Sequence, residues 1–156
     1  MKARIILSSL FFLLLTSTWP LMAQDSYMFK HLDTKNGLSN SQVNYIFKDG
    51  KGFMWFGTAS GLNRYDGYNY KIFRHKESIG HSIADNFVDL IQEDADGNLW
   101  IHTGVGYVFF DSKKEVFVNN LAEIMKGFGI NHIPSVVYID EDKYFWFYVM
   151  NLGGFF

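Results

Sequence analysis

The sequence contains no cysteine, only two prolines, and no excess of basic residues. Without cysteine, disulfide bonds cannot stabilise the fold, and attachment of a lipid to an N-terminal cysteine is excluded. The 14 Lys and Arg residues are balanced by 16 Asp and Glu residues, which gives a formal net charge of −2. A nucleic-acid partner would require a basic face to meet its phosphates, so we expect no such partner.

Aromatic residues, by contrast, are abundant. Hydrophobic residues make up 48% of the chain and aromatic residues 19%, with 16 Phe and 9 Tyr. This composition is sufficient for a buried core. Large, flat side chains are favoured on pleated, half-buried strands, so the composition predicts a β-rich protein.

Residues 1–23 are interpreted as a secretory signal peptide. Lys2 and Arg4 supply a basic start, residues 5–15 are almost entirely apolar, and Ala23 precedes the expected cleavage before Gln24. The alternative is an uncleaved membrane anchor, but the apolar run is shorter than the roughly 20 residues that a spanning helix needs. We therefore expect export, and a protein without disulfides fits the bacterial periplasm at least as well as the extracellular space.

The mature part contains a repeat. Trp55 and Trp100 occupy equivalent places in two similar segments, at an offset of 100 − 55 = 45 residues. The same offset relates further pairs: Val43 and Val88, Ile46 and Ile91, Asp49 and Asp94, Gly52 and Gly97, Thr58 and Thr103, Gly61 and Gly106, Asp66 and Asp111. A third, weaker copy places Trp146 one residue later, 146 − 100 = 46, and its turn has no glycine.

Each copy reads as four short strands joined by tight turns, which is the unit of a β-propeller blade. A β-sandwich would give no reason for groups of strands to repeat, and the apolar spacing near two excludes helical repeats. The predicted fold is all-β, with propeller blades of four antiparallel strands. Because propellers have about 4–8 blades, two blades and part of a third form an incomplete ring. The remaining blades would come from a longer chain or from a partner.

The predicted organisation has six segments. After the signal peptide, residues 24–37 form an entry segment and residues 38–75 the first blade. Residues 83–120 form the second blade, residues 121–132 an excursion with helical character, and residues 133–156 a partial third blade.

The repeat resembles a known family. The residues that carry the likeness are Gly37-Leu38-Ser39-Asn40-Ser41, then Gly52-Phe53-Met54-Trp55-Phe56-Gly57-Thr58, then Gly61-Leu62-Asn63-Arg64-Tyr65-Asp66-Gly67. This string is similar to the two-component regulator propeller repeat. The second copy departs from it at His102, where the repeat has glycine, and at Val108-Phe109, where the first copy has Asn63-Arg64.

The resemblance implies a role in signalling. Members of this family are periplasmic sensor regions of hybrid two-component histidine kinases of Bacteroidetes, many of which respond to glycan-derived oligosaccharides. The implied full-length protein is a homodimer, binds an oligosaccharide, and contacts the membrane through a helix downstream of these residues. No kinase region is present here, so the resemblance implies no catalysis by this chain. The alternatives are a secreted propeller that binds or processes polysaccharide, and a non-catalytic propeller that completes another chain's ring.

Residue roles are assigned by position. Trp55, Trp100 and Trp146 share one strand position and are predicted to pack blade against blade. Arg64, Tyr65 and Tyr68 lie beside the Asp66-Gly67 turn and are the candidates for ligand contact, since loops often carry specificity.

No cofactor, catalytic group or metal site is predicted. The segment from Asp94 to Asn98 resembles the start of a calcium loop but lacks the glutamate that such a loop needs near its twelfth position, so a hairpin turn is preferred. His75, His81 and His102 fall in different predicted segments and have no spacing typical of metal ligands.

Overall fold

A computed structural model describes residues 28–150 and 154–155 of the chain. The predicted signal peptide lies outside the described residues. The chain divides into two compact units, Met1–His31 and Leu32–Phe156. The architecture below is that of the second unit.

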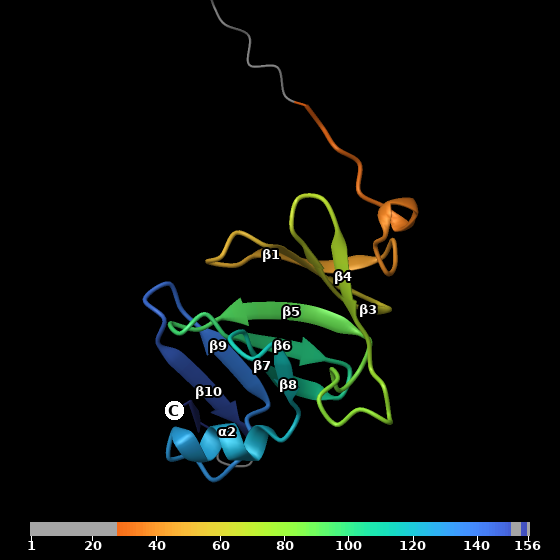
Figure 1. Cartoon of the computed structure of the whole chain (residues 1–156). Coiled ribbons are helices and arrows are strands. Elements are labelled where there is room, and N and C mark those ends of the chain that lie inside the picture. Colours follow the sequence, from red (N-terminus) through yellow and green to blue (C-terminus); the bar gives the residue numbers. More distant parts are fainter. Residues whose placement is uncertain (1–27, 151–153, 156) are drawn as a thin grey trace, which may run out of the picture. The chain divides into compact units, whose positions relative to one another are not determined.

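The second unit is built from three antiparallel sheets (Figure 1). Sheet 1 contains β1 (Val43–Lys48), β2 (Met54–Thr58), β3 (Gly61–Tyr65) and β4 (Tyr70–Phe73), paired in that order. Sheet 2 contains β5 (Val88–Glu93), β6 (Leu99–Thr103), β7 (Gly106–Asp111) and β8 (Val116–Val118). Sheet 3 contains β9 (Val136–Ile139), β10 (Phe145–Val149) and β11 (Gly154–Phe155). The predicted architecture of four-stranded antiparallel blades is confirmed, and the described strands do not close a ring.

The turn between the first two strands is the same in each sheet. Counted from the aspartate that opens the turn, the fourth residue has a positive φ, at Gly52 (91°), Gly97 (79°) and Lys143 (66°). Glycine takes this conformation without steric cost, whereas a side chain such as that of Lys143 meets the following carbonyl group. The third copy therefore keeps the turn geometry although it has lost the glycine.

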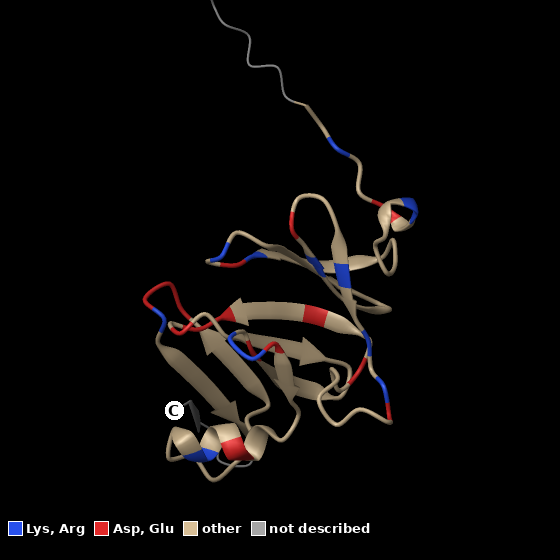
Figure 2. Ribbon diagram, viewed as in Figure 1, with Lys and Arg blue, Asp and Glu red and all other residues tan. Residues whose placement is uncertain are grey.

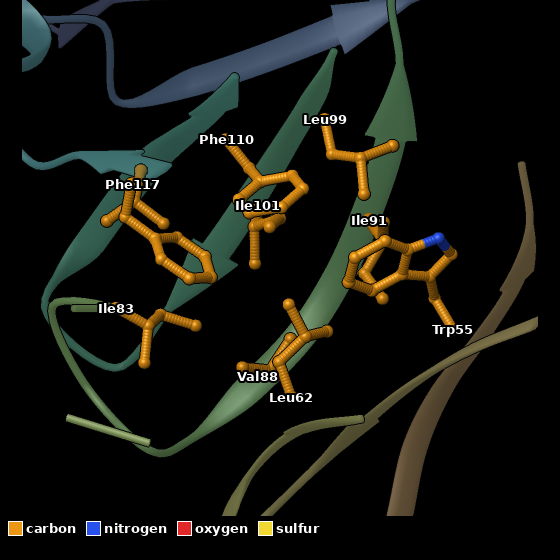
Figure 3. Packing of buried hydrophobic residues seen from close by; sticks show 10 residues of the cluster. Trp55, Leu62, Ile83, Val88, Ile91, Leu99, Ile101, Phe110 and Phe117 are labelled. Carbon is orange, nitrogen blue, oxygen red and sulfur yellow. The ribbon is translucent and has the colours of Figure 1, made fainter. Parts of the chain in front are cut away.

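The three sheets stack on one another in the same orientation. We call the face of each sheet that carries Trp55, Trp100 or Trp146 its front face, and the opposite face its rear face. Trp55 packs against Ile91 and Ile101 on the rear face of sheet 2 (Figure 3). Trp100 packs in the same way against Val137 and Phe147 on the rear face of sheet 3. The front faces of sheets 1 and 2 are thus each covered by the rear face of the next sheet.

The connection between sheets 2 and 3 contains the helix α2 (Leu121–Gly127). Leu121 and Met125 on this helix are buried in the cluster around Trp100. Phe128, which follows the helix, meets the Trp100 ring edge-on at a centroid distance of 6.1 Å. The excursion between the blades therefore closes one side of the second interface with apolar side chains.

The rear face of sheet 1 is partly covered by the segment before it. This segment contains the short 3-10 helix η2 (Thr34–Asn36), capped by Asp33, and then Leu38, which packs against Phe56 and Tyr65. The backbone N–H of Ser39 donates to the Asn63 side chain at 2.8 Å, and that side chain donates back to the Ser39 hydroxyl.

The equivalent positions in the second copy are Ala84 and Val108. Val108 is buried in the core between sheets 1 and 2, and Ala84 packs against that core. The two members of this contact have thus changed together, from polar in the first copy to apolar in the second.

Candidate ligand groove

A hydrogen bond from a tryptophan indole to an aspartate carboxylate is present in all three sheets. We call this contact the clasp. The indole N–H of Trp55 donates to Asp49 at 2.7 Å, that of Trp100 to Asp94 at 3.3 Å, and that of Trp146 to Asp140 at 2.9 Å. The other carboxylate oxygen of each aspartate accepts backbone N–H groups of its own turn. The clasp therefore fixes the turn and the tryptophan together. The bond from Trp146 also holds the pKa of Asp140 below its ordinary value.

The three tryptophans differ in burial. Trp55 and Trp100 are 1% and 0% exposed, whereas Trp146 is 48% exposed. The difference follows from the stacking polarity, because no described sheet covers the front face of sheet 3.

Arg64 links two sheets. Its guanidinium lies 4.5 Å from the ring centre of Phe53 and pairs with Glu115 of sheet 2 at 2.6 Å. Lys71 pairs with the second carboxylate oxygen of Glu115. Hydrogen bonds from Lys71 and Arg64 lower the pKa of Glu115 to about 2. The Arg64 side chain thus holds sheet 1 to the hairpin that joins β7 and β8.

The two tyrosines predicted as ligand contacts lie in different environments. Tyr65 is buried on the rear face of sheet 1, where its hydroxyl donates to the carbonyl of Gly67. Tyr68 is 88% exposed in the turn that follows β3. The structure therefore does not bring Arg64, Tyr65 and Tyr68 together around one site.

The Asp94 carboxylate and the His75 imidazole have local partners. Both carboxylate oxygens of Asp94 accept hydrogen bonds from Asn98, so the segment that resembles a calcium loop is a hairpin turn. Nδ1 of His75 lies 2.9 Å from the carbonyl of Ile83. Within residues 28–150 and 154–155, no three or more His, Asp or Glu side chains are grouped closely enough to share a metal ion.

A groove lies along the first strands of the three sheets, β1, β5 and β9. We call it the inner-strand groove. Its volume is about 360 Å³, within the range of about 300–1,000 Å³ that small-molecule sites occupy. The strands contribute these lining side chains: Tyr45, Phe47, Leu90, Gln92, Val136 and Tyr138. The lining is thus mainly aromatic and aliphatic.

Polar side chains line one end of the inner-strand groove and link its strands. The Gln92 amide donates to the carbonyl of Val137 and accepts from the N–H of Ile139, both at 2.8 Å, so it ties β5 to β9. Glu93 and Lys143 also line this end, and the ammonium of Lys143 donates to the backbone carbonyl of Glu93 at 2.9 Å. Figure 2 shows that acidic and basic residues occur in the turns at this end.

Next to the groove, sheet 2 carries an ionisable cluster. His102 pairs across the strands with Leu90, a groove residue, and its Nδ1 lies 2.7 Å from Asp89. The ring of Tyr107 meets that of His102 edge-on at 4.7 Å, and its hydroxyl donates to the carbonyl of Val137. Burial raises the pKa of Tyr107, and the nearby charge of Asp89 raises it further. His102 and Asp89 remain partly exposed, at 35% and 39%.

The cluster is specific to the second copy. The positions that correspond to Asp89, His102 and Tyr107 in sheet 1 are Asn44, Gly57 and Leu62. A Cβ atom on Gly57 would lie 2.8 Å from the Val88 side chain, so sheets 1 and 2 approach closely through this glycine. At the second interface His102 takes this place, and its side chain is directed towards Asp89 and Tyr107.

Three antiparallel sheets of one repeat, stacked front to rear, define a segment of a β-propeller. The family described as two component regulator propeller matches residues 37–60 and 82–104. The chain thus carries two copies of this repeat, and the resemblance seen in the sequence is confirmed.

Individual relatives agree with this assignment. A curated protein, Histidine kinase P4 of Formosa agariphila, is 42% identical over 65 residues, which are 41% of this chain and 5% of that protein. Two structures of one extracellular domain from B. thetaiotaomicron, described as part of a one component and of a hybrid two component system, are 23% and 22% identical. Their TM-scores are 0.56 and 0.55, and each covers 84% of this chain and 18% of the longer one. They share the fold, and the chain spans only a small part of the length of each relative.

Proposed function

We propose that this chain is a ligand-sensing propeller segment from the periplasmic part of a hybrid two-component sensor histidine kinase. The observation that supports this most strongly is the pair of matches to the two component regulator propeller, which include the first two strands of sheet 1 and of sheet 2. The likeness to a histidine kinase and to an extracellular domain supports the same assignment. Under this proposal the chain performs no catalysis, and the kinase belongs to another part of a longer polypeptide. Among the described residues, no helix has the length and apolar character needed to cross a bilayer.

We further propose that the inner-strand groove binds a neutral, glycan-derived oligosaccharide. Tyr45, Phe47 and Tyr138 line the groove, and aromatic faces stack on the apolar faces of sugar rings. The His102 and Asp89 side chains beside it can exchange hydrogen bonds with hydroxyl groups. Because β1, β5 and β9 come from different sheets, a ligand that contacts all three strands would favour one relative arrangement of the sheets.

Calorimetric titration with a set of neutral oligosaccharides tests the groove. Once a ligand is found, Tyr45→Ala and Tyr138→Ala should each weaken binding by roughly 3- to 10-fold, which is the range expected for the loss of one aromatic contact. Tyr68→Ala is the matched variant outside the groove and should leave the affinity unchanged. If Tyr68→Ala weakens binding and the two groove variants do not, the site lies at the Asp66-Gly67 turn instead.

The sensor assignment is tested separately, by sequencing the locus beyond the codon for Phe156. Further propeller repeats, a membrane helix and a histidine kinase region in the same reading frame are the expected result. A continuation without these regions would contradict the sensor assignment, but it would leave the binding measurements on the groove valid.

A further inference from the structure

A second pocket lies at the other edge of sheets 1 and 2, and we call it the outer pocket. It is bounded by β4, by β8 and by the connection between the two sheets, and its volume is about 170 Å³. β4 and β8 are the last strands of their sheets, at the edge opposite to β1 and β5. The apolar side chains that line the outer pocket are Ile72, Phe73, Ile79, Ile83 and Phe117. The outer pocket and the inner-strand groove share no lining residue, so the two are separate sites.

The outer pocket exists because the two connections between sheets differ. The connection between sheets 2 and 3 contains α2, whose side chains Leu121 and Met125 are buried in the cluster around Trp100. The connection between sheets 1 and 2, residues 74–87, contains no helix (Figure 1). At the repeat offset, Lys76 corresponds to the buried Leu121, 121 − 76 = 45. A charged side chain therefore lines the pocket where the next interface has an apolar one.

Three basic side chains with free donor groups line the outer pocket. Nε of Arg74 donates to the backbone carbonyl of Ser60 at 3.1 Å, and this bond anchors the side chain. In the part of the chain that the structure describes, the terminal nitrogens of Arg74, the ammonium of Lys76 and the imidazole of His81 have no acceptor. A guanidinium, an ammonium and an imidazole N–H can all donate to one anion.

The acidic side chain in the pocket lining, Glu115, does not supply that acceptor. Its two carboxylate oxygens pair with Arg64 at 2.6 Å and with Lys71 at 2.5 Å, so the three groups together carry a net positive charge. Glu77 follows Lys76 in the chain but does not line the pocket. Because a concave site lined by charges of one sign attracts the opposite charge, the outer pocket favours an anion.

We propose that the outer pocket binds a small organic anion. The carboxylate of this ligand accepts hydrogen bonds from Arg74, Lys76 and His81. Its apolar body contacts Ile79 and Phe117, which a bare inorganic anion would leave uncovered. The volume is below the range of about 300–1,000 Å³ that drug-sized ligands occupy, so the ligand has the size of a single ring or a short chain. Bound between β4 and β8, it contacts sheets 1 and 2 together.

Nuclear magnetic resonance titration of the full chain with three probes tests this proposal. Benzoate has a carboxylate on an apolar ring, benzamide is its neutral analogue, and inorganic phosphate is an anion without an apolar body. Benzoate should bind at least about fivefold more tightly than either of the other probes. Hydrogen bonds to an ionised group are roughly twice as strong as neutral ones, and only a probe with a ring buries apolar surface. The amide signals that shift should come from residues 72–83 and 115–117.

Each probe can contradict a part of the proposal. Equal affinities for benzoate and benzamide would overturn the role of the carboxylate. Equal affinities for benzoate and phosphate would overturn the role of the apolar lining. Benzoate that does not saturate the chain, or that shifts signals elsewhere, would overturn the site itself. None of the probes contains a sugar, so these results do not depend on the function proposed for the inner-strand groove.

A pair of charge-matched variants separates a site from a general effect of charge. Lys76→Gln should weaken benzoate binding by roughly 3- to 10-fold, because it removes one charged donor from the pocket. Lys126→Gln removes the same charge from the exposed surface of α2, outside the pocket, and should leave the affinity unchanged. A similar loss of affinity in both variants would mean that benzoate responds to net charge alone, which would overturn the proposal.

Discussion

Asp49, Asp94 and Asp140 each hold the tryptophan that follows six residues later. In the first two sheets the bond is buried, and a buried indole N–H that loses its acceptor costs about 1–3 kcal/mol. The same carboxylate accepts backbone N–H groups of its turn, so one side chain determines both the turn and the orientation of the aromatic ring.

Asp49→Ala should therefore lower the free energy of unfolding by about 2–4 kcal/mol, since it leaves the Trp55 indole and two turn N–H groups without an acceptor. Urea unfolding followed by tryptophan fluorescence measures the loss. Asp140→Ala removes the same kind of contacts at an exposed site and should cause a clearly smaller loss, because water can replace the carboxylate there. Equal losses in the two variants would show that burial of the clasp is not what matters.

At the scale of single residues, part of the arrangement around the three tryptophans could be predicted from the sequence. The shared position of the three tryptophans follows from the repeat, and so does the turn before each of them. The partner of the indole could not be predicted, because an aspartate six residues earlier reads in the sequence as an ordinary turn residue. The exposure of Trp146 depends on which sheet lies next to it, and no local pattern records that. The departure at His102 is visible in the sequence, but its pairing with Asp89 depends on the register between β5 and β6.

At the scale of elements, contacts between neighbouring sheets decide the arrangement. Sheets 1 and 2 approach closely at Gly57, where a Cβ atom would lie 2.9 Å from the backbone carbonyl oxygen of Val88. This carbonyl also accepts a hydrogen bond from the Asn44 side chain at 3.0 Å. Neither the Val88 carbonyl group nor the Asn44 side chain can move away from Gly57 without loss of this hydrogen bond.

Gly57→Ala should destabilise the protein by about 1–3 kcal/mol, the usual cost of an overpacked interior. Thermal unfolding followed by circular dichroism measures this effect. Gly80→Ala is the control, because a Cβ atom at Gly80 would meet nothing within 4 Å. If the two variants have the same melting temperature, sheets 1 and 2 are not in the close contact that the structure shows.

The Glu115 contacts between the same two sheets should give a pH dependence. The pKa of Glu115 is lowered from 4.5 to about 2 by Lys71 and Arg64, so its contribution is complete above about pH 4.5. This contribution disappears as the pH falls towards 2. Because the side chain is 40% exposed, solvent screening limits it to about 1 kcal/mol or less.

Glu115→Gln should remove this part of the pH dependence, which comparison of unfolding free energies at pH 6 and pH 3 would show. Glu77→Gln, in the connection between sheets 1 and 2, is a suitable control because this residue is exposed. An unchanged pH dependence in Glu115→Gln would mean that the pairs with Arg64 and Lys71 do not form in solution.

The strand order within each sheet could be predicted, because alternation and tight turns allow one simple antiparallel arrangement. The assignment of Arg64 to ligand contact rested on its position beside a turn. Its actual partners, Phe53 and Glu115, lie on a strand boundary and on a different sheet. Contacts across sheets depend on the stacking distance and the twist, which the spacing of residues along the chain does not reveal.

At the scale of the whole molecule, uncovered faces govern behaviour in solution. Val136, Tyr138 and Trp146 expose apolar surface that the other sheets bury. Stability should therefore depend on protein concentration, since association that occurs only in the folded state raises the melting temperature by mass action. A melting temperature that rises between micromolar and hundred-micromolar chain is expected from calorimetry. A sharp, reversible transition of a monomer, independent of concentration, would contradict this expectation.

Glu93 contacts both neighbouring sheets at once. Its carboxylate accepts the N–H of Gly50 in the first turn, and its backbone carbonyl accepts the ammonium of Lys143 in the third. A tilt of either outer sheet away from the middle one must break one of these bonds. We therefore expect the three sheets to move together as one rigid unit at this end, because Glu93 joins them. A displacement that begins at one blade would be carried to the far one without being absorbed between them.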